Sequence, residues 1–311
     1  MPGQEDKKRA DFRPLVAVVL VLAGGILVGG LLAPLLFHGL VGLGRRFAAL
    51  SALRNIEFTA VASRCVAVFV LAAMWPALRW SGMACRGALG LRAQPRWGGA
   101  LFTGLVWGVL SVAGLWAAGW RLGAYTWNPP AGGALLGIIL RTGLAACVVG
   151  LLEEFFFRGV VYGGLRKSMR WWGAALWASV FYAWLHFAQP APPLGVVHVQ
   201  WFSGWELLCH FPGAGIGWTN LFPSILTLFL AGLLLCRLYA QRGDLYLSMG
   251  LHAGWVWVML VGFEFLEREP EVHPFLFGSS GNVTRTYPAF LVALVCVPLL
   301  LRLARVKETD R

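Results

Sequence analysis

The stretch GLAACVVGLLEEFFFRGVVYGGL, residues 143–165, places two adjacent carboxylates inside an otherwise apolar sequence. They belong to Glu153 and Glu154, and no other acidic residue occurs between Phe58 and Trp205. A charged side chain at the centre of a membrane-spanning helix costs about 3 kcal/mol, and two neighbouring carboxylates also repel each other. Such a pair must be compensated by a partner, by protonation or by a function.

The composition around this stretch is that of a membrane protein. Hydrophobic residues make up 58% of the 311 residues, charged residues 13%, and the mean hydropathy is +0.68. A soluble domain carries about 25% charged residues, so too little polar surface remains to coat a water-exposed globule. The lipid bilayer is therefore the expected solvent for most of the chain.

A net charge of +12 would suggest nucleic acid as a partner for a soluble protein. Here Lys and Arg lie mostly in short clusters between apolar stretches, and no basic stripe with interleaved aromatic residues is present. We therefore expect no nucleic-acid binding, and we expect the clusters to set the topology in the membrane.

The apolar stretches predict an all-α fold, a polytopic membrane helical bundle of about eight transmembrane helices with an embedded polar cavity. The mixed segment 38–59 is expected to lie at the membrane interface or to form a short amphipathic helix. The expected spans are 14–37, 60–80, 98–120, 131–165, 171–188, 222–241, 245–263 and 288–306.

The positive charges place both termini in the cytoplasm, because each terminal segment has four Lys or Arg residues and the loops on the same side carry more. On the opposite side the later loops carry only Arg121, Arg268 and Arg285, the last two offset by four glutamates. The connection between the first two expected spans is the exception, because it carries Arg45, Arg46 and Arg54, with Arg64 at the start of the second span. The termini are similar to those of bacterial inner-membrane proteins, so we expect an integral protein of the bacterial inner (plasma) membrane.

The chain is expected to be organised around one core. Residues 1–13 form a basic cytoplasmic tail, 14–129 the N-terminal transmembrane segments, and 266–311 the last loop, the final span and a basic tail. Residues 130–265 form the core, with an inserted loop at 188–221 that is rich in Trp and Pro. Trp at this density is typical of a membrane interface, although a loop of this length is alternatively a lid or an entrance.

Helix geometry separates the two glutamates. Arg158 lies four residues after Glu154, the spacing that places two side chains on one helix face. We therefore predict an ion pair between Glu154 and Arg158. Glu153 points about 100° away and has no such partner in its own helix, so its carboxylate is left to accept and return a proton.

Two histidines in apolar surroundings are candidate partners for Glu153. Taking the basic turn near 166–170 as the reference, Glu153 lies roughly 20 Å and His186 roughly 24 Å above it, at 1.5 Å per residue. His252 lies only about 14 Å above the turn at 242–244. Its depth agrees less well, and a match requires a tilt of its span or an early break there.

Each feature also has a structural interpretation. A single histidine in a span often makes only an interhelical hydrogen bond, and a Glu–Arg pair in one helix is often structural. The combination of a glutamate pair, an arginine four residues later and two buried histidines on separate spans favours a functional site.

The ordered residues resemble the membrane-embedded CAAX protease and bacteriocin-processing family, also called the abortive infection family of glutamate endopeptidases. Its signature is E-E-x-x-x-R on one span, F-x-x-x-H on the next and H-x-x-x-N on a later one. The resemblance covers residues 130–265. The three motifs here run from Glu153 to Arg158, from Tyr182 to His186 and from His252 to Val256.

The first motif is complete, whereas the other two each depart from the family at one position. Tyr182 stands where the family has Phe, and Val256 stands where it has Asn. Because the family's third-motif His and Asn form an oxyanion hole, loss of the Asn donor predicts a rate about 10²–10³-fold lower. Either Trp255, Trp257 or Ser248 replaces that donor, or turnover is slow or absent.

The resemblance implies an intramembrane, metal-independent endopeptidase that acts on a peptide or membrane-protein substrate. Glu153, helped by His186, would activate a water for attack on a peptide carbonyl, with no covalent intermediate and no cofactor. His252 would be the third catalytic residue, and the supporting residues would be Glu154, Arg158, Tyr182 and Val256.

Two alternatives remain. Glu153, His186 and His252 could supply the three protein ligands of a catalytic zinc ion in a zinc-dependent membrane protease, although no H-E-x-x-H motif is present. A non-catalytic membrane scaffold or immunity protein that retains the pocket is favoured by Val256.

Overall fold

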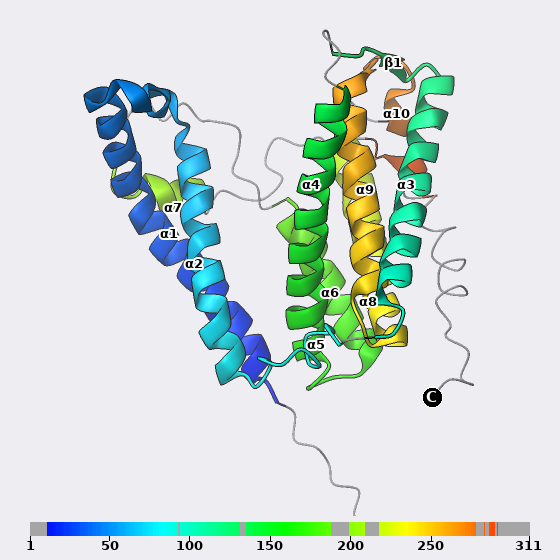
Figure 1. The fold of residues 1–311 in the computed structure, drawn as a ribbon, viewed down its shortest axis with the longest axis horizontal. Helices are drawn as coiled ribbons and strands as arrows, with labels where there is room; N and C mark the ends of the chain where they lie inside the picture. The colour runs from blue at the N-terminus through cyan, green and yellow to red at the C-terminus, as the bar shows by residue number, and fades with distance from the viewer. Residues whose placement is uncertain are drawn as a thin grey trace, which may run out of the picture. The chain divides into compact units, whose positions relative to one another are not determined.

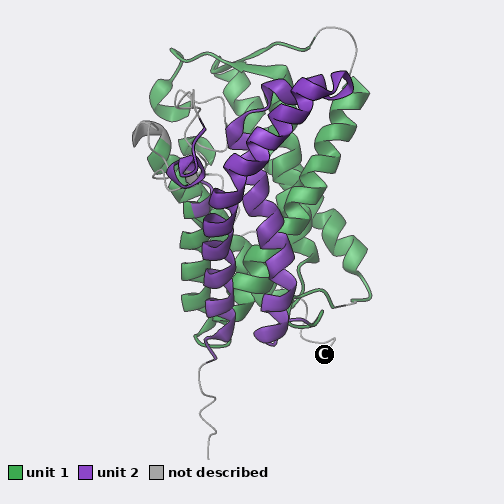
Figure 2. Ribbon diagram, turned by 90° about the vertical axis from the view of Figure 1, so that its left-hand side faces the viewer, with its two compact units in different colours: residues 1–10, 85–184, 216–311 green, residues 11–84, 185–215 purple. Residues whose placement is uncertain are grey.

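The structure is a computed structural model, and it describes residues 11–92, 94–130, 135–187, 199–208, 218–277, 283, 286–289 and 291. The chain divides into two compact units, which Figure 2 colours separately. Unit 1 comprises residues 1–10, 85–184 and 216–311, and unit 2 comprises residues 11–84 and 185–215.

Unit 1 is built around three long helices. Helix α9 (Tyr246–Phe265) lies between α3 (Trp97–Arg121) and α4 (Leu135–Glu154), as Figure 1 shows. The remaining elements are the π-helix η2 (Phe155–Tyr162), α5 (Gly163–Leu165), α6 (Trp171–Leu185), α8 (Trp218–Arg242) and α10 (Pro274–Phe277), with the antiparallel strands β1 (Tyr125–Trp127) and β2 (Leu266–Arg268).

Helices α3 and α9 touch through backbone atoms because each carries a Gly-x-x-x-Gly motif. An added Cβ would lie 2.2 Å from the Leu247 oxygen at Gly104 and 2.0 Å from the Leu101 oxygen at Gly250. The corresponding distances are 2.3 Å at Gly108, to the Leu251 oxygen, and 2.5 Å at Gly254, to the Leu105 oxygen. Small residues at this spacing allow close helix packing in membranes, and we call these four residues the glycine seam.

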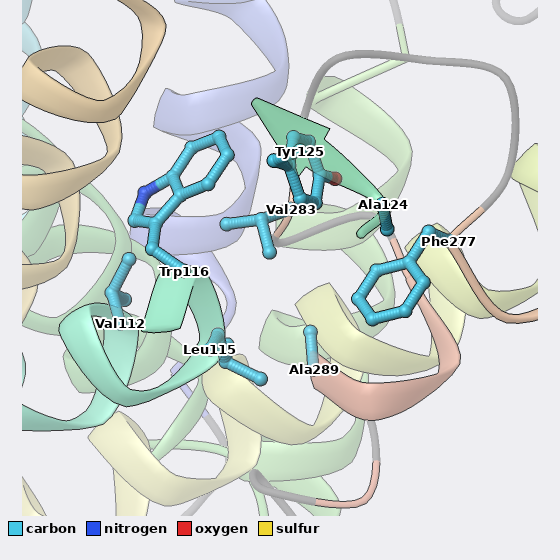
Figure 3. Close-up of a cluster of buried hydrophobic side chains, with 8 residues drawn as sticks. All are labelled: Val112, Leu115, Trp116, Ala124, Tyr125, Phe277, Val283 and Ala289. Atoms are coloured by element: carbon cyan, nitrogen blue, oxygen red, sulfur yellow. The ribbon is translucent and has the colours of Figure 1, made fainter. Parts of the chain in front are cut away.

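The opposite end of α9 leads into β2 and an aromatic cluster. Figure 3 shows Trp116 and Tyr125 side by side, with ring centroids 4.7 Å apart, and Phe277 nearby. The guanidinium of Arg268 lies 5.6 Å from the Tyr125 ring centroid. Burial raises the pKa of Tyr125 to about 12, against the lowering effect of Arg268, so its phenol is neutral at physiological pH.

Unit 2 contains α1 (Arg13–Arg46), the 3-10 helix η1 (Ala48–Asn55), α2 (Phe58–Trp80) and the short α7 (Ser203–Leu208). Helix α7 packs on α1, and the indole nitrogen of Trp205 donates to the Leu27 carbonyl at 3.0 Å. A Cβ at Gly204 would lie 2.1 Å from the Gly30 oxygen. The described part of the long loop is therefore held by the first helix.

The helices have the surface of a membrane protein. On α4, Leu136, Leu140 and Leu144 recur every fourth residue with exposed fractions of 69%, 62% and 69%. An apolar stripe of this kind is stable in hydrocarbon and not in water. The expected all-α polytopic membrane bundle is confirmed, and the chain is an integral membrane protein.

Among the described residues, six helices are long and apolar enough to cross a membrane, namely 13–46, 58–80, 97–121, 135–165, 221–242 and 246–265. Helix α6, in the expected span 171–188, has only 15 residues. The expected span 288–306 and both charged tails lie almost entirely outside the described residues.

The predicted end of the first helix was wrong, and of the tilt or early break considered for α9 the break is absent. Helix α1 continues to Arg46, well past the expected end at residue 37, because residues 38–44 contain no charged side chain that would stop an apolar helix. The interfacial segment is reduced to η1 and its flanking residues. Helix α9 has no early break, because its glycines pack against α3 and leave the helix intact.

Candidate active site

The two glutamates lie where the chain changes from an α-helix to a π-helix. Glu153 and Glu154 are the last residues of α4, and the π-helix η2 follows them directly. A π-helix bonds i to i+5 and is often found at functional sites, because it turns side chains out of the regular α-helical order. Nothing in the residue pattern predicted this change.

The predicted ion pair between Glu154 and Arg158 is present and fully buried. Nη1 of Arg158 donates to Oε1 of Glu154 at 2.8 Å, and the two side chains are 0% and 1% exposed. The guanidinium also lies 4.6 Å from the ring centroid of Tyr182 on α6. Glu154 is therefore an ionised, buried carboxylate whose charge is balanced inside the protein.

Helix α9 brings His252 to both glutamates. Nδ1 of His252 lies 2.8 Å from Oε1 of Glu154, and Nε2 lies 3.6 Å from Oε2 of Glu153. Because an ionised carboxylate only accepts hydrogen bonds, Nδ1 carries a hydrogen and donates a hydrogen bond to Glu154. The Nε2 nitrogen is thereby turned towards Glu153 at a distance that suits a bridging water better than a direct hydrogen bond.

The two glutamates differ in access. The side chain of Glu153 is 30% exposed, whereas that of Glu154 is 0% exposed. Glu154 is held by Arg158 and by His252. Part of the Glu153 side chain is therefore accessible, whereas that of Glu154 is fully enclosed.

Packing explains why His252 reaches this position. The residue lies between Gly250 and Gly254 of the glycine seam, so the backbone of α9 is fixed against α3. On the other side, an added Cβ at Gly150 of α4 would lie 3.0 Å from Ala253. Small residues on both neighbours thus bring α9 close enough to α4 for one imidazole to span two carboxylates.

The donors considered as replacements for the missing Asn are engaged elsewhere. Nε1 of Trp255 donates to Ser111 at 3.0 Å, and Nε1 of Trp257 lies 3.3 Å from the Ile139 carbonyl. The hydroxyl of Ser248 donates to the Leu245 carbonyl at 2.9 Å. Val256 itself is half-buried, one turn after His252 on α9.

Of the expected catalytic residues, Glu153 and His252 are brought together, and the supporting residues Glu154, Arg158 and Tyr182 surround them. His186 follows directly after α6, is half-buried and belongs to unit 2. Its partnership with Glu153 remains a prediction. The contact of His252 with Glu154 was missed, and the two Gly-x-x-x-Gly motifs were the signal that pointed to it.

No group of three or more His, Cys, Asp or Glu side chains within the described part of the chain is arranged to hold a metal ion. The polar atoms at the site are two carboxylates, one imidazole, one guanidinium and one phenol. They are suited to acid–base chemistry on a water and a carbonyl.

Residues 132–258 match the family model described as Type II CAAX prenyl endopeptidase Rce1-like. The match contains all three motifs and confirms, over these residues, the resemblance drawn from them. It supports a CAAX-type intramembrane protease. Neither the curated proteins nor the solved structures contain a match to this chain.

Proposed function

We propose that this chain is an intramembrane endopeptidase that hydrolyses a peptide bond with a water activated by Glu153 and without a metal ion. The observation that supports this most directly is the difference between the glutamates. Glu154 is buried between Arg158 and His252, while Glu153 stays 30% exposed beside the same imidazole.

The reaction follows from these positions. Glu153 accepts a proton from a water whose oxygen attacks the peptide carbonyl carbon. The protonated Glu153 then gives this proton to the leaving nitrogen as the C–N bond breaks. The Glu154–Arg158 pair keeps His252 in one tautomer, and the sequence assigns His186 to assist Glu153 with the water.

The proposed substrate is a peptide or membrane protein that reaches the site from the bilayer. The matching family is described by its action on prenylated CAAX ends, so peptides with and without a prenylated C-terminal Cys are the first to compare. The proposed protease core is residues 130–265.

Cleavage by reconstituted protein tests the proposal. We expect the wild type to cut members of a quenched-fluorescent peptide library in proteoliposomes, and Glu153→Gln to lower kcat at least about 100-fold because the general base is lost. Arg141→Met is a matched control on the same helix. Equal cleavage by wild type and Glu153→Gln would show that Glu153 is not the base.

Two rival functions have distinct outcomes in the same assay. If a chelator abolishes cleavage and zinc restores it, the enzyme is a zinc-dependent protease. If no peptide is cut at all, the chain is a membrane scaffold or immunity protein that retains the pocket. Val256, together with the engagement of Trp255 and Trp257 elsewhere, favours this second candidate.

The proposed location is a bacterial inner membrane with both termini in the cytoplasm, on the basis of the positive charges in the terminal segments. Reporter fusions at each end of the chain test this orientation. Periplasmic activity of either fusion would contradict it.

A further inference from the structure

We propose that one end of unit 1 binds the headgroups of anionic phospholipids, and that the bound headgroups hold together the helices that carry the candidate site. We call it the basic end, and it consists of the described segments 85–92, 94–97, 166–172 and 237–246. It lies outside the group of Glu153, Glu154 and His252, and lipid binding there requires no catalytic turnover.

Positive charge is concentrated at the basic end. Its segments contain eight Lys or Arg residues and a single acidic residue, Asp244, which is buried and pairs with Arg242 at 3.3 Å. Six of the eight cationic side chains are exposed. The opposite end of unit 1, residues 121–130, 135–141 and 262–277, contains three arginines and four glutamates. The charge of unit 1 is therefore strongly asymmetric between its two ends.

Contacts between the segments bring these charges onto one surface. The backbone N–H of Leu245 donates to the carbonyl of Gly90 at 3.0 Å, so the turn between α8 and α9 is bonded to the segment that precedes α3. The rings of Tyr162 and Tyr239 meet edge-on at 5.8 Å, which joins the end of the π-helix to α8. The backbone N–H of Arg166 donates to the Tyr162 carbonyl at 2.9 Å, so the third turn begins at the same place.

Tryptophan side chains at the basic end favour a lipid surface over an acidic protein as the partner. Trp97, Trp171 and Trp172 are exposed there, and Trp is typical of the headgroup level of a membrane. The guanidinium of Arg237 lies 4.6 Å from the ring centroid of Trp171, so a positive charge is held beside one of these indoles.

The long helices of unit 1 begin or end at this surface, as Figure 1 shows at the lower end of α3, α8 and α9. Because the apolar sides of these helices face hydrocarbon, the phosphates of the adjoining leaflet are the anions that lie at the same level. Each Lys or Arg near such a surface strengthens the attraction of anionic headgroups about fivefold. The sign, the position and the neighbouring indoles therefore agree on one occupant.

Bound headgroups would link the elements of the candidate site. Arg166 and Arg170 follow the π-helix that begins after Glu154, and Arg242 precedes the helix that carries His252. A phosphate that accepts hydrogen bonds from arginines of both turns bridges these two elements. Like charges crowded on one surface also repel each other, and anionic headgroups reduce that repulsion. We therefore expect anionic lipid to stabilise unit 1.

Retained lipid measures the binding. The full-length protein is purified in micelles that contain equimolar phosphatidylglycerol and phosphatidylcholine with the same acyl chains, and its bound lipids are quantified by mass spectrometry. We expect phosphatidylglycerol to exceed phosphatidylcholine at least about fivefold at about 0.1 M NaCl, and the excess to fall to about twofold or less at about 1 M. The triple variant Arg92→Gln, Arg170→Gln and Arg237→Gln, which removes one charge from each turn, should retain the two lipids nearly equally.

The triple variant Arg45→Gln, Arg46→Gln and Arg121→Gln is the matched control, because it removes three exposed arginines from outside the basic end. It should keep the lipid ratio of the wild type. Phosphatidylglycerol should also raise the midpoint of thermal unfolding of the wild type and of the control, and leave that of the first triple variant unchanged. Unfolding in phosphatidylcholine alone identifies a variant that does not fold, and the salt dependence of the wild type then decides.

Equal retention of the two lipids by the wild type would overturn the inference, and so would an equal loss of preference in both triple variants. Binding of soluble polyglutamate without any preference between the lipids would identify an acidic protein as the partner and would overturn it as well. None of these outcomes depends on peptide cleavage, so the proposed function is tested separately.

Discussion

Adjacent glutamates acquire different properties here because successive side chains of an α-helix point about 100° apart. One side chain turns towards Arg158 and is removed from solvent, and the other stays 30% exposed. A single imidazole then joins them, with Nδ1 on Glu154 and Nε2 towards Glu153. The buried carboxylate holds one nitrogen of the imidazole, and the half-buried one lies beside the other nitrogen.

Removal of Arg158 should therefore destabilise the protein much more than removal of an exposed arginine. Arg158→Met leaves the charge of Glu154 buried without its partner, and we expect a loss of about 3–5 kcal/mol in the free energy of unfolding. Arg141→Met is the control, because its pair with Glu264 is 64% and 34% exposed and should contribute less than about 1 kcal/mol.

Thermal unfolding in the same detergent measures both variants. An equal shift for Arg158→Met and Arg141→Met would contradict a stabilising buried pair. Addition of Glu154→Gln to Arg158→Met should recover part of the loss, because the uncompensated charge is then absent.

The sequence was sufficient for local geometry and insufficient for contacts between helices. The Glu154–Arg158 pair depends only on a spacing of four residues within one helix. The contact of His252 with both glutamates depends on how α9 packs against α4. The depth of each residue, estimated from its distance to the nearest turn, does not determine this packing. The edge-on contact of Tyr182 with Phe157 likewise depends on α6 facing the π-helix.

At the scale of the elements, the glycine seam determines where α9 lies. Backbone-to-backbone contact at four positions makes the pair of helices intolerant of even one added methyl group. The π-helix after Glu154 is the second determining element, and it was not predictable, because Phe155–Tyr162 has the composition of an ordinary apolar helix.

A single Cβ at the seam should lower both stability and cleavage. In Gly250→Ala the new atom would lie 2.0 Å from the Leu101 oxygen, so α3 and α9 must separate. We expect a loss of about 1–3 kcal/mol from overpacking and a fall in kcat, since His252 is two residues away. Thermal unfolding and peptide cleavage measure the two effects.

Gly114→Ala on α3 is the matched control, because its Cβ meets nothing within 4 Å. Higher helix propensity should make this variant slightly more stable, by about 0.5–1 kcal/mol. If Gly250→Ala were as stable and as active as Gly114→Ala, the seam would not be a close contact.

At the scale of the whole chain, the sequence folds into two compact units, each with its own internal packing. Composition predicted the membrane class, and the apolar stretches predicted most of the long helices within a few residues. The division into units was not visible, because α7 lies in a loop whose sequence is dominated by Trp and Pro. Its attachment to α1 rests on a contact between Gly30 and Gly204 that spans most of the first two hundred residues.

The attachment of α7 should be breakable without disturbing unit 1. In Gly204→Ala the Cβ would lie 2.1 Å from the Gly30 oxygen, which should detach α7 and break the hydrogen bond from Trp205 to Leu27. Hydrogen exchange should then rise in residues 199–208, with protection unchanged in α3, α4 and α9, because locally packed units open separately.

Gly39→Ala on α1 is the control, since its Cβ would meet nothing within 4 Å. We expect no change in exchange for that variant. Loss of protection spread evenly over α3, α4 and α9 in Gly204→Ala would contradict independent unfolding of the two units.

The glycine seam also determines how this protein should respond to bilayer thickness. Helices in contact through backbone atoms cannot slide past each other by one residue without steric overlap, so α3 and α9 must tilt together when the hydrocarbon layer becomes thinner or thicker. The height of His252 relative to α3 is then constant in any lipid. Lipid chain length should therefore change how substrates reach the site and leave the spacing of its catalytic groups unchanged.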